Sequence, residues 1–237
     1  MSNVDTAEIR RFESLASRWW DPQGEMAPLH HINPLRLRYI DEACGGIAGK
    51  RAVDVGCGGG ILTEGLAERG AAEALGIDLA EASLKVAELH RLESEAATEY
   101  RLCSAEELAD ERPESFDLVC CLEMLEHVPN PASVVEACAR LARPGGTIVF
   151  STINRTPKAY ALAIVGAEYV LHLLPRGTHD YARFIRPSEL DAWCRAADLD
   201  SVEVRGMRYN PLLKTASLGR DIDVNYLMHC RKPGAGV

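Results

Sequence analysis

The sequence predicts a single α/β domain built on a doubly wound, mostly parallel sheet of seven strands. From residue 51 onward, short apolar runs alternate with longer amphipathic ones, as in strands joined by helices within a parallel sheet. A glycine-rich loop follows the first run, where open sheets of this class bind ligands. The chain has 237 residues, 47% of them hydrophobic, which suits one domain with a sizeable core. We expect residues 1–237 to form one domain, with an N-terminal helical cap at 1–48 and an insertion at 155–180.

The predicted cap contains two helices. Apolar residues recur at helical spacing over residues 6–20, and Asp5 or Thr6 supplies an N-cap. A second helix is expected to begin at Asn33 and Pro34, because an N-cap residue is followed there by a proline suited to the first turn.

The remaining elements follow the alternation in order. Strands are predicted at residues 51–55, 72–77, 99–103, 116–121, 146–152, 200–207 and 223–230. Helices are predicted at residues 60–69, 81–95, 104–109, 131–142 and 188–197. The last helix should begin at Ser188, with Asp191 three residues later as in a capping box. Pro144 opens a turn that separates a helix from the fifth strand.

Charge and cysteine usage exclude some classes of protein. The formal net charge is -9 and the basic residues are scattered, which argues against a nucleic-acid partner. The eight cysteines form no C-x-x-C pair, as expected for reduced thiols rather than a disulfide framework or zinc site. The N-terminal run is polar and acidic, so we expect no signal peptide and a cytoplasmic location.

The loop after the first strand has glycines at Gly56, Gly58 and Gly60. Glycine allows the tight turn and lets the backbone approach a ligand closely. A dinucleotide-binding loop needs its third small residue at position 61, which is Ile61 here. Asp54 opens the loop, and a carboxylate is unfavourable beside a pyrophosphate but favourable beside a sulfonium or amino group. The loop therefore favours a sulfonium nucleoside over a dinucleotide.

Two further acidic residues fit the same ligand. Asp78 ends the second strand, where a carboxylate accepts hydrogen bonds from ribose hydroxyls. Glu106 follows the third strand, where the adenine edge would lie. These positions, in register with Asp54, make the glycine pattern far more specific than it is alone.

Candidate catalytic groups cluster after the fourth strand. Glu123, Glu126 and His127 lie within five positions at the carboxyl edge of the predicted sheet. Methylation of a phenol requires loss of a proton with an ordinary pKa of ~10. A general base such as His127 or Glu126 can remove it, or a divalent cation held by all three residues can acidify it. The residues are compatible with either a general base or a bound cation.

The insertion is almost entirely apolar from Pro157 to Pro175. It is slightly short for a membrane span and contains Glu168, so it fits a helix at the membrane interface or a buried lid over the site. Both alternatives indicate a hydrophobic substrate. His179 follows in a polar loop and is another candidate base.

Several runs resemble one family, the bacterial ubiquinone-biosynthesis O-methyltransferases and their mitochondrial relatives. The glycine loop is shared with all class I methyltransferases, whereas the other runs are more particular. The matching runs cover most of the chain: 17–21, 28–30, 32–36, 54–60, 123–129, 165–169, 177–180 and 223–226.

The resemblance implies a Rossmann-like class I methyltransferase fold. It also implies S-adenosylmethionine-dependent O-methylation of a polyprenyl catechol and a demethylubiquinol. The cofactor is then expected to contact Arg36, Gly56, Asp78 and Leu122, with Arg36 pairing the methionine carboxylate. The family further implies Mg²⁺ or another divalent cation on the three residues after the fourth strand.

The partners implied are a prenylated phenol or quinol, other ubiquinone-biosynthesis proteins, and a membrane. Peripheral contact with the inner face of the cytoplasmic membrane would run through residues 155–176. Three other interpretations are compatible with parts of the sequence. One is methylation of another hydrophobic phenol, and one is a non-catalytic S-adenosylmethionine-binding scaffold. The third, a nicotinamide oxidoreductase, is disfavoured by Ile61 and Asp54.

Overall fold

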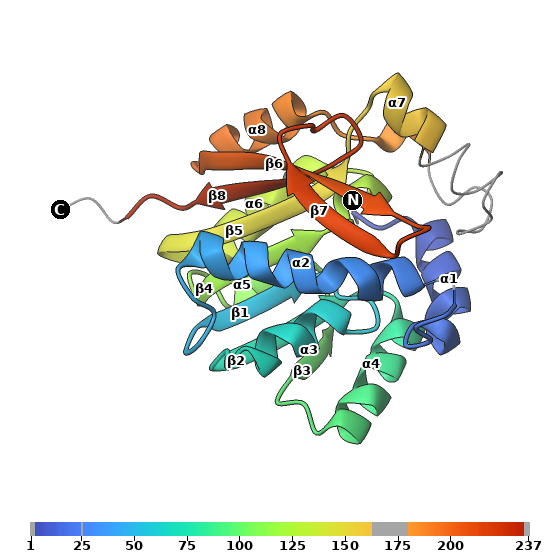
Figure 1. Cartoon of the computed structure of the whole chain (residues 1–237). Coiled ribbons are helices and arrows are strands. Elements are labelled where there is room, and N and C mark those ends of the chain that lie inside the picture. The colour runs from blue at the N-terminus through green and yellow to red at the C-terminus, as the bar shows by residue number, and fades with distance from the viewer. Residues whose placement is uncertain (1–2, 25, 163–179, 235–237) are drawn as a thin grey trace.

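The computed structural model describes residues 3–24, 26–162 and 180–234. An eight-stranded sheet crosses the molecule in the order β3-β2-β1-β4-β5-β8-β6-β7, with helices on both faces (Figure 1). The strands are β1 Arg51–Val55, β2 Glu73–Asp78, β3 Glu99–Leu102, β4 Phe116–Leu122, β5 Ala142–Ile153, β6 Asp200–Asn210, β7 Thr215–Gly219 and β8 Asn225–Arg231. The predicted α/β class and doubly wound topology are confirmed.

The first five strands are parallel, and β8 is antiparallel to both β5 and β6. The strand order reverses between β1 and β4, so the loops that leave these two strands diverge to opposite faces. Such a reversal opens a crevice at the carboxyl ends of the strands, where open sheets bind their ligands. The site is therefore expected beyond Val55, Asp78 and Leu122.

Helices cover the two faces of the sheet with separate apolar cores. Alternate residues of β4 serve the two cores, since Val119 packs with one and Leu118 with the other. The first core includes residues of α5, α6 and α8, and the second includes residues of α2 and α3. The helices that follow β1 are α3 Ile61–Glu68, α4 Glu81–Ser94, α5 Ala105–Glu111, α6 Pro131–Leu141, α7 Pro157–Ala159 and α8 Pro187–Ala196.

The N-terminal segment contains α1 Thr6–Leu15, the short helix η1 Ala16–Arg18 and α2 Ala27–Cys44. Asp5 caps α1 by accepting the amide N–H of Ala7 at 3.0 Å. The prediction that the second helix begins at Asn33 and Pro34 is wrong, because α2 begins at Ala27 and contains Pro34. Pro28 takes the first turn of α2, and Pro34 is tolerated inside it at the cost of one backbone hydrogen bond.

The C-terminal part differs from the sequence prediction in three places. One strand was missed: β6 and β7 form a hairpin, so the sheet has eight strands rather than seven. The turn predicted from Pro144 is instead an irregularity within β5, between the pairs Phe116–Ala142 and Leu118–Thr147. The last helix begins at Pro187 rather than Ser188, and Glu189 accepts the amide N–H of Arg186 at 2.8 Å.

The insertion is described only at its two ends. Residues 155–162 include the short helix α7, and residues 180–183 include the short helix η4 Tyr181–Arg183. The apolar run beyond residue 162 and His179 lie outside the described residues. Within the described ranges, no helix has both the length and the apolarity needed to span a bilayer.

Candidate active site

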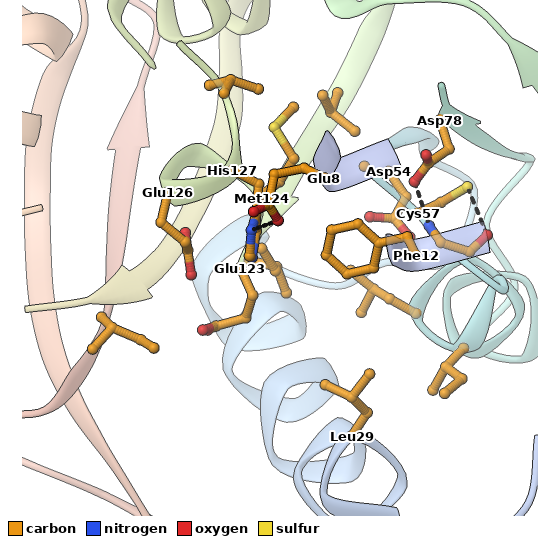
Figure 2. A pocket seen from close by; sticks show the side chains of 18 of the residues that line it. Glu8, Phe12, Leu29, Asp54, Cys57, Asp78, Glu123, Met124, Glu126 and His127 are labelled. Atoms are coloured by element: carbon orange, nitrogen blue, oxygen red, sulfur yellow. Dashed lines mark hydrogen bonds and ion pairs between the residues drawn. The ribbon is translucent and has the colours of Figure 1, made fainter. Parts of the chain in front are cut away.

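A cavity of about 830 Å³ lies at the carboxyl ends of the parallel strands. Its lining comes from the loops after β1, β2 and β4, from helices α1 and α2, and from the β6–β7 hairpin and the start of β8. Figure 2 shows Asp54 and Asp78 on one side of this cavity and Glu123, Glu126 and His127 on the other, with Phe12 between the two groups. All ten of the predicted site residues that the structure describes line this cavity.

The glycine loop is shaped by positive φ angles and by close neighbours. Gly56, Gly58 and Gly60 have φ angles of 77°, 53° and 87°. A Cβ on Gly58 would lie 2.2 Å from the ring of Trp19, and one on Gly60 would lie 2.2 Å from the hydroxyl of Tyr100. The glycines are therefore required both by the backbone conformation and by side chains packed against it.

Asp78 fixes the turn that faces the cavity. One carboxylate oxygen accepts the amide N–H of Gly58 at 2.8 Å, and the other accepts the amide N–H of Ala80 at 2.8 Å. Burial raises the pKa of Asp78, while these two backbone donors oppose the increase. Each oxygen retains lone pairs, so the carboxylate can still accept hydrogen bonds from a ligand.

Asp54 is the most deeply buried carboxyl of the cofactor side, at 2% exposure. It accepts a hydrogen bond from the hydroxyl of Thr63 at 2.8 Å. Burial raises its pKa to about 7, which the Thr63 hydroxyl opposes. A cationic ligand group nearby would stabilise the ionised form and thereby offset this burial.

Glu123 occupies the bend at the end of β4. It has a φ of 54°, a conformation that is strained for a residue with a side chain and is often found at functional sites. Its carboxylate pairs with Arg36 at 3.0 Å and accepts hydrogen bonds from Ser151 at 2.6 Å and from Asn225 at 2.9 Å. Glu123 is therefore well supplied with donors from the protein itself.

Arg36 reaches this carboxylate from α2 and is buried at 6% exposure. Its Nε atom is buried and has no hydrogen-bond partner among the described residues. Because Arg36 lines the cavity, this donor fits the prediction that the guanidinium binds an anionic group of the cofactor.

The two remaining candidates have different partners. Glu126 is 5% exposed and accepts a hydrogen bond from Thr152 at 2.8 Å. Burial, followed by the charge of Glu123, raises the pKa of Glu126 to about 7.

His127 pairs through Nδ1 with the carboxylate of Glu8 at 2.9 Å, which lowers the pKa of Glu8. The ring of Phe12 meets the imidazole edge-on at 5.0 Å between centroids.

With these contacts, the three predicted metal ligands do not converge on one point. Glu123, Glu126 and His127 each contact a different protein partner: Arg36, Thr152 and Glu8. The described ranges contain no group of three or more His, Cys, Asp or Glu side chains placed to hold a metal ion. In this arrangement the residues do not fit a bound cation, and the metal site stays a prediction.

The other predicted cofactor contacts lie at the cavity wall. Leu122 ends β4 and lines the cavity beside the glycine loop. Glu106 lies in the first turn of α5, and its carboxylate accepts hydrogen bonds from Ser133 at 2.8 Å and Asn3 at 3.0 Å. It therefore helps to hold the N-terminal segment against the far end of the cavity.

Sequence reasoning missed the contribution of the N-terminal helices to the site. Phe12 and Trp19, which lie in the segment predicted as a helix over residues 6–20, line the candidate site. Trp19 covers the glycine loop, and Glu8 fixes His127 across 119 positions. Only the resemblance of the run 17–21 to a known family drew attention to this segment. No pattern within the sequence indicates the pairing of Glu8 with His127.

Comparison with known proteins places this geometry in a family. A model of the methyltransferase domain matches residues 53–150, which run from β1 through β5. The ubiquinone biosynthesis O-methyltransferase of Hahella chejuensis is 61% identical, over 98% of this chain and 97% of that protein. Proteins of the same name from Pseudomonas aeruginosa and Azoarcus sp. are each 59% identical, over 98% of this chain and 99% of theirs.

Solved structures confirm the fold at much lower identity. The magnesium protoporphyrin IX methyltransferase of Synechocystis, with bound S-adenosylhomocysteine, superposes with a TM-score of 0.67. It is 17% identical and matches 95% of this chain and 93% of its own. A methyltransferase from Thermotoga maritima, described as a possible histamine N-methyltransferase, gives a TM-score of 0.63 at 18% identity, over 95% and 98% of the two chains.

The relatives match almost the whole chain at about 60% identity, so they identify a particular family and not only a methyltransferase domain. The relatives match the N-terminal helices and the C-terminal hairpin as well as the glycine loop. The chain therefore belongs to the family of ubiquinone biosynthesis O-methyltransferases and is an S-adenosylmethionine-dependent O-methyltransferase of the class I fold.

Proposed function

We propose that this protein transfers the methyl group of S-adenosylmethionine to a phenolic oxygen of polyprenyl catechol and demethylubiquinol intermediates of ubiquinone biosynthesis. The observation that carries the proposal is a single cavity with two unlike halves. One half has the glycine loop, Asp54 and Asp78, and the other has apolar side chains from the C-terminal hairpin and from Leu162, which follows α7. The names of the relatives, which match almost the whole chain, support O-methylation in ubiquinone biosynthesis.

The first half suits the cofactor. Asp78 would accept hydrogen bonds from the ribose hydroxyls, and Arg36 would pair the methionine carboxylate. Asp54 would face the cationic end of the molecule, where an ionised carboxylate stabilises positive charge. Leu122 and Glu106 would lie along the nucleoside. Together these contacts would point the sulfonium methyl toward the second half of the cavity.

The second half suits an aromatic ring with an apolar tail. Its lining is largely apolar and includes Ile153, Leu162, Met207, Pro211 and Val224. Burial of such surface against a prenyl chain contributes roughly 25 cal/mol per Å². Alignment of the two substrates in one cavity would supply much of the rate enhancement, because it turns the encounter into an intramolecular step.

The acceptor must lose its phenolic proton before or during attack. Glu8 pairs with Nδ1 of His127, which fixes a tautomer with the Nδ1 hydrogen toward the carboxylate and leaves Nε2 free to accept a proton. We assign His127 as the base and Glu8 as the residue that orients it. The phenolate oxygen then forms a bond to the methyl carbon, and the carbon–sulfur bond breaks to give S-adenosylhomocysteine.

Two alternative bases follow from the sequence. Glu126 has a pKa of about 7, so a fraction of it is ionised at neutral pH and able to accept a proton. His179 lies outside the described residues. The divalent cation stays a prediction, and no step of this mechanism passes through it.

The membrane and protein partners belong to this proposal as well. Residues 155–176 would contact lipid at the inner face of the cytoplasmic membrane. In the described part of this segment, Tyr160 and Leu162 expose 46% and 54% of their surface, which supports an apolar contact there. Association with other ubiquinone-biosynthesis proteins is proposed from the family alone. Deletion of residues 158–174 should reduce flotation with liposomes, and undiminished flotation would contradict this contact.

Transfer of labelled methyl from S-adenosylmethionine to a short-chain demethylubiquinol tests the function. We expect transfer by the wild-type protein and a turnover about 100- to 10,000-fold lower for His127→Ala, with S-adenosylhomocysteine affinity changed less. Undiminished turnover of His127→Ala would move the base to Glu126 or His179. A parallel reaction with chelator tests the metal, since loss of activity restored by Mg²⁺ would show that a cation takes part.

The same assay separates the alternatives. Another hydrophobic phenol as substrate would give transfer to that phenol and none to the demethylubiquinol. A non-catalytic scaffold would bind S-adenosylhomocysteine and transfer methyl to neither. Thermal stabilisation by S-adenosylhomocysteine but not by NAD would further distinguish a methyltransferase from an oxidoreductase.

A further inference from the structure

The tip of the β6–β7 hairpin, residues 211–214, exposes two adjacent leucines. Leu212 is 86% exposed and Leu213 is 71% exposed, the highest values among the exposed large hydrophobic residues of the described chain. Lys214 follows them and is also exposed. Two adjacent large apolar side chains with such high exposure lower the solubility of a protein. In a folded protein they often mark a surface that contacts an apolar partner.

The tip is held in a defined shape. The side-chain oxygen of Asn210 accepts the amide N–H groups of Leu212 at 3.0 Å and of Leu213 at 3.1 Å. The hairpin below is anchored to α2, because the hydroxyl of Tyr209 contacts Nδ1 of His31 at 2.7 Å. A fixed tip can present its leucines without a large loss of conformational entropy on binding.

The tip also borders the substrate cavity. Tyr209 and Pro211 of the hairpin line the cavity, as does Leu162 beyond α7, so both segments contribute apolar residues to its wall. Asp221 connects the two segments at this rim of the cavity, since its carboxylate pairs with Lys158 of α7 at 2.7 Å and with Arg208 of β6. In Figure 1, the turn of this hairpin lies on the same side of the molecule as the N-terminal helix α1, which lines the cavity.

We propose that the hairpin tip inserts Leu212 and Leu213 into the acyl region of a phospholipid bilayer. Two side chains on a narrow turn provide far less surface than the roughly 800 Å² that each partner of a stable protein complex buries. They are enough to enter a lipid leaflet, with Lys214 left at the level of the phosphates. A bilayer contact at this rim would let the tail of a lipid-soluble substrate enter the cavity without crossing water.

This contact is separate from the one proposed for residues 155–176, and its driving force is apolar. The chain carries a formal net charge of -9 and a single lysine follows the two leucines, so we expect apolar insertion rather than attraction to anionic lipids to drive this contact. Insertion of leucines is little affected by ionic strength, whereas contacts between exposed charges are screened. Binding through the tip should therefore occur on uncharged phosphatidylcholine vesicles and persist at high salt.

The test compares two double variants of the full chain by flotation with phosphatidylcholine vesicles. L212S/L213S removes the tip leucines, and L89S/L92S removes a matched pair on α4 with 61% and 60% exposure. We expect at least a tenfold lower partition coefficient for L212S/L213S and an unchanged one for L89S/L92S. Equal partitioning of wild type and L212S/L213S would overturn the proposal, as would absence of wild-type binding.

A second measurement places the tip directly. Leu212→Trp keeps an apolar side chain, so it should bind vesicles as the wild type does, and brominated acyl chains should quench its added fluorescence. An emission that vesicles leave unchanged would overturn the insertion even if L212S/L213S misfolds. Both readouts are independent of turnover, so failure of the proposed methyl transfer would be recognised separately with a water-soluble acceptor in the absence of lipid.

Discussion

The two halves of the sheet contribute residues to the same cavity in different ways. In the parallel half, the loops after β1 and β2 contribute Asp54, the glycines and Asp78, which lie within a short stretch of sequence. In the half that contains the antiparallel strand β8, the contacts join distant segments. Asn225 reaches Glu123 across 102 positions, and Tyr209 reaches His31 across 178.

In the proposed mechanism, this difference separates recognition of the cofactor from recognition of the acceptor. The proposed cofactor half is formed by backbone shape and buried carboxylates. The proposed acceptor half is lined by apolar side chains of the hairpin and by Leu162, which follows α7. We expect changes in the first half to alter cofactor affinity and changes in the second to alter which acceptor is methylated.

The largest effect expected in the cofactor half concerns the charge of Asp54. The pKa of Asp54 is raised to about 7 in the folded protein, whereas an unfolded aspartate titrates near ~3.9. Because the folded pKa is the higher one, its contribution to stability is complete below about pH 4 and is lost as the pH rises through about 7. Asp54→Asn cannot titrate and keeps an acceptor for Thr63.

The free energy of unfolding of ligand-free Asp54→Asn, relative to wild type, should therefore increase by up to about 4 kcal/mol between about pH 4 and pH 8. Urea titrations across this range measure the difference. Asp110→Asn is the control, since Asp110 is exposed and pairs with Arg140 at the surface. A difference that does not vary with pH would mean that Asp54 is not a buried, titrating carboxyl.

A smaller effect is expected when Asp78 is removed. Asp78→Ala eliminates an acceptor for the ribose and releases the amide N–H groups of Gly58 and Ala80. Hydrogen bonds to a charged group contribute about 1.5–3 kcal/mol each, so S-adenosylhomocysteine should bind about 100-fold more weakly. Calorimetric titration measures this change, with Asp110→Ala as the control. Wild-type affinity in Asp78→Ala would place the nucleoside elsewhere.

The smallest of the three effects tests how the N-terminal helices cover the glycine loop. Gly58 and Gly45 both have positive φ angles, but a Cβ on Gly58 would lie 2.2 Å from Trp19, whereas one on Gly45 would meet nothing within 4 Å. Gly45→Ala should cost about 1 kcal/mol of stability from backbone strain alone. Gly58→Ala should cost about 2 kcal/mol more, because the ring must move.

A double-mutant cycle with Trp19→Ala sharpens this result. In that background the added methyl group meets no ring, so the costs of Gly58→Ala and Gly45→Ala should become similar. A cost for Gly58→Ala that is the same with and without the Trp19 ring would show that Trp19 does not cover the loop.

The difference between the two halves of the sheet also explains which elements could be predicted from the sequence and which could not. The parallel strands follow from alternating apolar and amphipathic runs, so the fold class was predicted correctly. The glycine loop and Asp78 were singled out from local spacing, and they line the cavity, but their contact with the cofactor stays a prediction. The hairpin strand β7 was missed because its residues lack a clear apolar alternation and it lies at the edge of the sheet.

The proposed acceptor side and the pairing of Glu8 with His127 are harder to predict for a physical reason. Glu8 is an ordinary acidic residue in the first turn of a helix, and only the packing of α1 against the cavity brings it to His127. The start of α2 was misplaced because both Pro28 and Pro34 suit a first turn, and packing rather than local preference decides between them. Such choices depend on contacts between segments far apart in sequence.

We propose that the loop at residues 56–60 and Asp78 hold the sulfonium nucleoside with its methyl group toward the C-terminal hairpin. A crystal structure with bound S-adenosylhomocysteine would show this directly. We expect ribose hydroxyls on the Asp78 carboxylate, the methionine carboxylate at Arg36 and the sulfur facing the apolar half of the cavity. Density for the nucleoside in another position, or with its sulfur directed away from the hairpin, would contradict it.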